Sequence, residues 1–161
     1  MKEIIFGYKN LPVWKGGYSF SVYEDGIVNY EKLSVKRLVI ESKEIVIPKS
    51  VVEDVEKCLI KQKILIDKFP EKQINSGFLI DGAIDYFNFI GNEIYCWNIL
   101  RMSNEDIYKM ELKYGKFSLD TMNIVQLQNN ILEVFESAYK FLKNYGLKVY
   151  SWNHFHCDWE M

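Results

Sequence analysis

The chain has 161 residues, of which 48 % are hydrophobic and 26 % charged, and its formal net charge is −2 at pH 7. Such a length buries about 68–70 % of the unfolded surface, so one globular domain needs neither metal nor disulfide. The near balance of charge and the two arginines, Arg37 and Arg101, argue against a nucleic-acid partner and against a polybasic membrane anchor.

The cysteines and the lengths of the apolar runs bear on the cellular location of the protein. Cys58, Cys96 and Cys157 are an odd, scattered set without a CxxC pair, which is typical of reduced cytosolic thiols. No apolar run reaches the length of a signal peptide core or of a membrane span. No linker-like segment interrupts the sequence, so we expect a single cytoplasmic domain over residues 1–161.

Residues 18–32 form the clearest local pattern, a β-hairpin. A two-residue turn at Asp25-Gly26 would leave both faces mixed. A three-residue loop with Gly26 in the left-handed region instead pairs Val22 with Val28 and Phe20 with Tyr30. One face then becomes apolar and the other mostly polar, so we predict the three-residue loop and a half-buried antiparallel sheet.

Alternating patterns predict the remaining strands. A second hairpin is expected to turn at Gly91-Asn92, which pairs Phe89 with Ile94 and Phe87 with Cys96. The other predicted strands are Lys2–Phe6, Leu33–Glu41, Glu44–Ile47 (after a break at Ser42-Lys43), Phe78–Ile80, and an edge strand at Leu147–Trp152.

Helical periodicity predicts three helices. Ser50 and Glu53 have capping-box spacing, which predicts a capped helix near 50–67. The same spacing at Ser103–Asp106 opens a short helix that ends at Gly115. The long C-terminal helix near 120–145 has an apolar face and a terminal glycine cap: Ile124, Leu127, Ile131, Phe135, Ala138, Leu142, Tyr145 and Gly146. The fold class is therefore α+β, an antiparallel sheet of hairpins covered by helices.

The C-terminal tail offers the most enzyme-like pattern. On an extended strand His154, His156 and Asp158 share a face and could hold one metal ion, as in a metal-dependent hydrolase. Trp152 and Phe155 favour an ordinary packed tail instead. We therefore predict no metal and no cofactor.

Other reactive groups have structural explanations. Asp81 and Asp85 flank Gly82, where one raised carboxyl pKa would suit a general acid, but Asp-Gly is also an ordinary turn signal. Cys96 falls on the apolar face of its strand and Cys58 lies within a helix, as unreactive thiols do. We assign no catalytic residue and expect no enzyme.

The binding interpretation rests on the second hairpin. Tyr86, Tyr95 and Trp97 share the face opposite Phe87 and Phe89, and Asp85 and Glu93 lie nearby. Tyrosine and tryptophan are enriched among the anchors of protein interfaces, so these five residues are the candidate partner site: Tyr86, Tyr95, Trp97, Asp85 and Glu93. The alternative is that the long helix covers this face and leaves Phe87 and Phe89 partly exposed.

Several short motifs carry a family resemblance. They are Gly16-Gly17, Ser19, Ser21, Tyr23, Asp25-Gly26 and Tyr30, then Ile47-Pro48, Asp81-Gly82 and Trp97-Asn98-Ile99. With them the chain loosely resembles a group of small proteins of AT-rich bacteria, some of which look like toxin-immunity proteins. The resemblance implies a protein that binds a cognate toxin and blocks it by steric occlusion.

We therefore expect a non-catalytic protein-binding module, an immunity or accessory protein with a protein partner. Two alternatives stay open at this point. One is the metal-dependent hydrolase that uses the tail histidines. The other is a structural homo-oligomer, a homodimer closed by edge strands near Leu147–Trp152.

Overall fold

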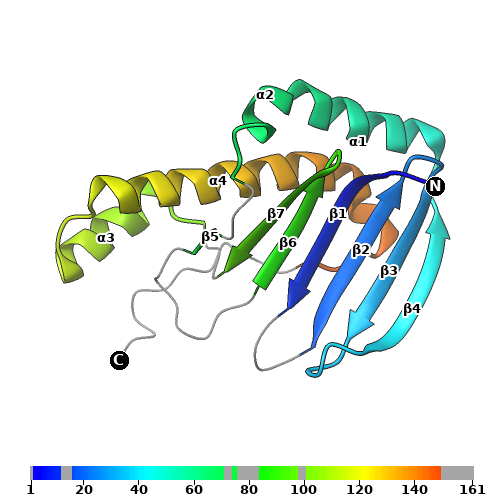
Figure 1. Cartoon of the computed structure of the whole chain (residues 1–161), viewed down its shortest axis with the longest axis horizontal. Helices are drawn as coiled ribbons and strands as arrows, with labels where there is room; N and C mark the ends of the chain where they lie inside the picture. Colours follow the sequence, from blue (N-terminus) through cyan, green and yellow to red (C-terminus); the bar gives the residue numbers. More distant parts are fainter. Residues whose placement is uncertain (1, 12–15, 71–73, 76–83, 98–100, 150–161) are drawn as a thin grey trace.

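A seven-stranded sheet forms the centre of the structure, with strand order β4-β3-β2-β1-β6-β7-β5 (Figure 1). The computed structural model describes residues 2–11, 16–70, 74–75, 84–97 and 101–149. The strands are β1 (Ile4–Leu11), β2 (Gly17–Tyr23), β3 (Ile27–Leu33), β4 (Val39–Val46), β5 (Ile74–Asn75), β6 (Ile84–Phe89) and β7 (Asn92–Trp97). The helices are α1 (Lys49–Lys61), α2 (Lys63–Ile66), α3 (Asn104–Tyr114), α4 (Leu119–Tyr139) and the 3-10 helix η1 (Lys140–Tyr145).

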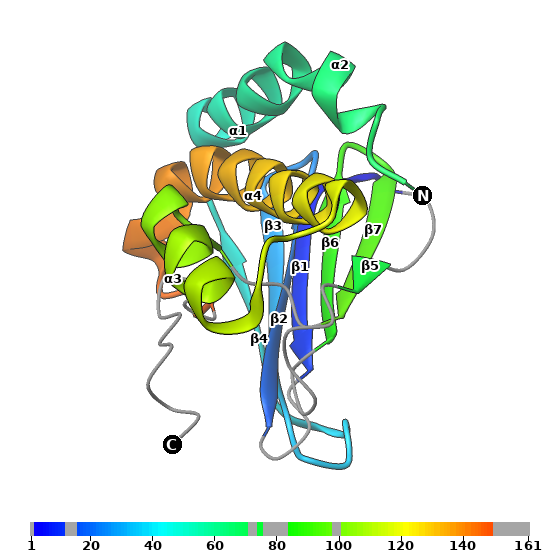
Figure 2. The ribbon, with the colours of Figure 1, turned by 90° about the vertical axis from the view of Figure 1, so that its left-hand side faces the viewer.

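The sheet is antiparallel except at one edge, where the short β5 pairs parallel with β7. Consecutive hairpins join β1, β2, β3 and β4, whereas β1 meets β6 only after the intervening helices. Helices α1, α2, α4 and η1 all contribute side chains to the core on one face of the sheet (Figures 1 and 2). This confirms the α+β architecture with helices on an antiparallel sheet. We call the opposite face the outer face.

Phe135 lies at the middle of the core. Its ring on α4 is 5.3 Å from that of Phe6, 5.1 Å from that of Tyr8 and 5.4 Å from that of Phe87, centroid to centroid. These partners come from β1, the central strand, and from β6 beside it. One helical side chain thus joins the two hairpin systems of the sheet.

The first hairpin has the predicted register. Val22 pairs with Val28 and Phe20 with Tyr30, and Gly26 has a φ of +90°. The second hairpin departs from the prediction, because the turn is formed by Ile90 and Gly91, both with positive φ. Phe87 therefore pairs with Ile94, and the register is shifted by two residues. A shift of two keeps every side chain on its predicted face.

The structure also tests the predicted helix caps and the predicted break in β4. The helix α1 begins after Pro48, which has no side-chain cap, and the carbonyl of Pro48 accepts the N–H of Val51 and of Val52. Ser50 is already inside the first turn, so its predicted capping role is wrong. The capping box at Ser103 is confirmed, with Asp106 as its second member. The predicted break at 42–43 is also wrong, since β4 runs through it.

The structure confirms the predicted C-terminal helix but not the strand predicted after it. The predicted helix near 120–145 corresponds to α4 and η1, and Gly146 has the expected left-handed conformation with a φ of +73°. Residues 147–149 form no strand, which contradicts the first half of the expected edge strand. The rest of that strand, and the strand predicted at 78–80, lie outside the described residues.

Candidate functional site

The outer face of the β6–β7 hairpin brings three of the predicted aromatic residues together. Tyr86 pairs directly with Tyr95 across the two strands, and Trp97 pairs with Ile84. Strand alternation puts Phe87 and Ile94 on the helix-covered face, and so Tyr86, Tyr95 and Trp97 on the outer face. We call Tyr86, Tyr95 and Trp97 the aromatic patch.

The two tyrosines of the patch form an ordered pair. Their ring centroids are 5.0 Å apart at an interplanar angle of 51°, a favourable aromatic arrangement. The Tyr86 hydroxyl donates a 2.8 Å hydrogen bond to Glu93, and Asn88 donates to that hydroxyl at 3.4 Å. Tyr86 is half-buried while Tyr95 is 44 % exposed. The patch therefore presents Tyr95 to solvent, while hydrogen bonds hold the Tyr86 hydroxyl in place.

Burial and the Glu93 hydrogen bond together raise the pKa of Tyr86 from 10.0 to about 12. The unfolded chain loses this proton near the lower value and the folded chain near the higher one, so within that window the unfolded state binds fewer protons. Stability must then fall as pH rises. We expect Tyr86→Phe to show a shallower fall than the wild type, measured by urea unfolding at pH steps across the window. Parallel curves for the two proteins would contradict the assignment.

Asp85 does not belong to the patch, which corrects the sequence prediction. It lies on the helix-covered face, is 2 % exposed, and accepts a 2.8 Å hydrogen bond from the side-chain amide of Asn10. Strand alternation explains this, since Asp85 and its neighbour Tyr86 must point to opposite faces. Glu93 is the carboxylate of the predicted set that lies with the aromatic residues.

A cation that the sequence pattern does not reveal lies beside the patch. Lys9 on β1 pairs with Tyr86, so the outer-face row continues from Tyr95 through Tyr86 to Lys9. Leu11 likewise pairs with Ile84, next to Trp97. No local pattern could reveal these neighbours, because β1 and β6 are far apart in the sequence. The patch is thus bordered by charges of both signs, Lys9 and Glu93.

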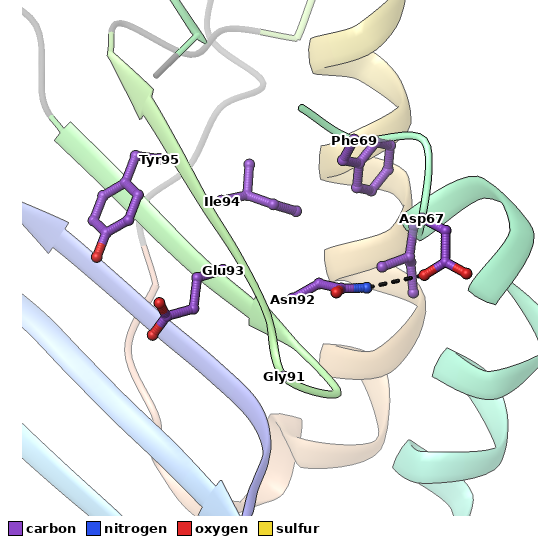
Figure 3. A pocket seen from close by; sticks show the side chains of 8 residues that line it. Asp67, Phe69, Gly91, Asn92, Glu93, Ile94 and Tyr95 are labelled. Atoms are coloured by element: carbon purple, nitrogen blue, oxygen red, sulfur yellow. Dashed lines mark hydrogen bonds between the residues drawn. The ribbon is translucent and has the colours of Figure 1, made fainter. Parts of the chain in front are cut away.

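A groove of about 540 Å³ runs along the other side of β7 (Figure 3). Its walls include Asp67 and Phe69 after α2, and Ile94 of β7. A 3.2 Å hydrogen bond from the side-chain amide of Asn92 to Asp67 crosses its end. In Figure 3 the side chain of Tyr95 lies on the opposite side of β7 from that of Phe69. Glu93 and Tyr95 also line the groove, so the groove and the aromatic patch share part of β7.

Of the two described thiols, Cys96 has the environment of an unreactive group. Cys96 is buried, and burial raises the pKa of its thiol. Cys58 is half-buried and its thiol donates to the hydroxyl of Ser137 at 3.4 Å. A thiol with a raised pKa is a poor nucleophile at neutral pH.

Other predicted chemical positions fall outside the described part of the chain: His154, His156, Asp158, Cys157 and the Asp81-Gly82 turn. Within residues 2–11, 16–70, 74–75, 84–97 and 101–149, no three His, Cys, Asp or Glu side chains gather as metal ligands do. In the same residues no helix combines the length and apolar character that crossing a bilayer requires.

Comparisons with known proteins add no relative. No family model matches the chain, and neither a curated protein nor a solved structure matches it.

Proposed function

We propose that the chain is a non-catalytic protein-binding module whose partner contacts the aromatic patch. One observation carries the proposal: helices α1, α2, α4 and η1 pack on one face of the sheet, and Tyr86, Tyr95 and Trp97 share the other face. Tyr95 has 44 % of its surface exposed and is therefore accessible on this face.

The chemistry of the patch supports this role. Tyrosine and tryptophan offer large contact areas with few rotatable bonds, so ordering them on binding costs little entropy. Here paired strands fix their positions, and the Glu93 hydrogen bond fixes Tyr86 further. Lys9 and Glu93 at the border add charges that select the orientation of a partner. An arrangement of this kind suits a small, pre-formed protein interface.

The finer proposal concerns the identity of the partner. The loose resemblance to toxin-immunity proteins supports a toxin, which the module would block by covering part of its surface. Steric occlusion requires a rigid surface and no catalytic group. The paired strands β6 and β7 give the aromatic patch such a rigid support, and occlusion needs no metal or cofactor.

The test is affinity capture from cells that express the chain with its genomic neighbours. We expect the wild type to retain a partner in a 1:1 complex and Tyr95→Ala/Trp97→Ala to lose it. Circular dichroism and the melting temperature of the variant should stay near wild type, because the two side chains are partly exposed.

A matched control removes two aromatic residues elsewhere. Tyr108 and Tyr114 on α3 are 62 % and 59 % exposed, so Tyr108→Ala/Tyr114→Ala makes a comparable change far from the patch. This control should capture the partner as well as the wild type does. Equal capture by all three proteins would refute the patch, and a large fall in melting temperature of the first variant would mark it as part of the core.

A further inference from the structure

Strand β4 forms a free edge of the sheet. It is last in the strand order and pairs with β3 on one side, and no strand of the described residues pairs with its other side (Figure 1). All of its residues except Ile45 are exposed. Four large apolar side chains lie along or beside it in solvent: Leu38 at 64 % exposure, Val39 at 52 %, Ile40 at 59 % and Val46 at 73 %. An exposed edge with such side chains is a template for pairing with another strand.

The ladder shows which backbone groups face outward. The N–H of Ile47 donates to the carbonyl of Gly26 at 2.9 Å, so that pair is of the hydrogen-bonded kind. Such pairs alternate along an antiparallel ladder, so Glu41 and Lys43 direct their backbone groups toward β3. Ser42 between them directs its N–H and C=O to the free edge.

We propose that a second copy of the chain adds to β4 across a two-fold axis at Ser42, which makes one continuous sheet through both copies. Antiparallel addition about an axis normal to the sheet keeps the helix-covered face of each copy on the same side. Ser42 then exchanges two backbone hydrogen bonds with Ser42 of the second copy. The interface closes on itself, so it yields a dimer and no fibre.

The charges on β4 select this register. With the axis at Ser42, Glu41 lies opposite Lys43 of the second copy, and the symmetric pair repeats the contact. These are non-hydrogen-bonded pairs, in which opposite side chains come closest. An axis at Lys43 would place two lysines together, and one at Glu41 or Glu44 would place two glutamates together. Edge charges usually prevent pairing, but here their alternation favours one self-complementary arrangement.

Charge reversal tests the register. We expect sedimentation velocity to show a concentration-dependent dimer for the wild type, with Kd raised roughly tenfold or more by Glu41→Lys or by Lys43→Glu. Mixing these two variants should restore a 1:1 dimer, because each lysine of one then faces a glutamate of the other. The double exchange E41K/K43E should restore the homodimer. Glu44→Lys makes the same charge change opposite Ile40, and so should leave Kd near wild type.

Three outcomes would overturn the proposal. They are a wild type that stays monomeric up to its solubility limit, equal weakening by Glu41→Lys and Glu44→Lys, and a mixture that fails to recover. All variants change exposed residues of β4, so their melting temperatures should confirm that they fold.

Cross-linking gives an independent test of the axis. In a hydrogen-bonded pair the two Cα atoms lie about 5.5 Å apart, within the range of a disulfide. With Cys157→Ser to remove a native thiol, Ser42→Cys should form a covalent dimer under mild oxidation, and Glu44→Cys should not. The reverse pattern would refute an axis at Ser42. These tests are separate from partner capture, because β4 and the aromatic patch lie toward opposite ends of the strand order.

Discussion

Replacing Phe135 by alanine should lower the free energy of unfolding by about 3–5 kcal/mol, the loss typical of a buried Phe→Ala change. The side chain has no exposed surface and contacts rings from β1 and β6 at centroid distances of 5.1–5.4 Å. The side chains around Phe135 are close-packed, so they cannot move enough to fill the space that the ring leaves. A cavity therefore remains in the alanine variant. A loss of this size is a large part of the 5–15 kcal/mol that stabilises ordinary domains.

Urea unfolding followed by circular dichroism measures this loss. Phe135→Leu keeps most of the volume and should cost much less than the alanine variant. Tyr108→Ala, an exposed aromatic change on α3, should stay within about 0.5 kcal/mol of the wild type. If Phe135→Ala behaved like Tyr108→Ala, then α4 would not pack on the sheet as described.

Local patterns in the sequence determine the β2–β3 hairpin. The loop length, the glycine with positive φ and the alternation of Phe20 and Val22 all favour one register, and the structure has it. The β6–β7 hairpin shows the limit of such reasoning. Gly-Asn is one of the two-residue turn signals, yet Ile90 takes the first turn position, where a β-branched residue is disfavoured. Its N–H donates to the carbonyl of Ile5 and its side chain packs on the core, so tertiary contacts outweigh the local preference.

Hydrophobic periodicity predicts some of the residues that α4 buries, but not all of them. Ile131 and Phe135 are buried as expected, but Leu127 is only half-buried and Gln128 is fully buried. The side-chain amide of Gln128 has no hydrogen-bond partner within the described part of the chain. Hydrophobic periodicity counts only apolar residues as core positions, so it cannot predict a buried glutamine such as Gln128.

The same limits apply to the candidate site. Strand alternation correctly grouped Tyr86, Tyr95 and Trp97 on one face, since that requires only a period of two. It could not say which face the helices cover, because that depends on how α4 packs against β1 and β6. Lys9 lies beside Tyr86 because β1 pairs with β6, a contact that no local pattern encodes.

Gly26→Ala should cost about 2–3 kcal/mol, because it adds a steric contact to a strained backbone. A Cβ at this position would lie 2.8 Å from the carbonyl oxygen of Ile47, and the φ of +90° disfavours any residue with a side chain. The same glycine accepts the N–H of Ile47 at 2.9 Å, so relief of the contact would break a bond that ties the β2–β3 turn to the start of α1. Gly91 is the matched control, with a φ of +86° and nothing within 4 Å of its Cβ. Gly91→Ala should therefore cost only the backbone term of about 1–2 kcal/mol, and equal losses in thermal and urea unfolding would show that the Ile47 contact contributes nothing.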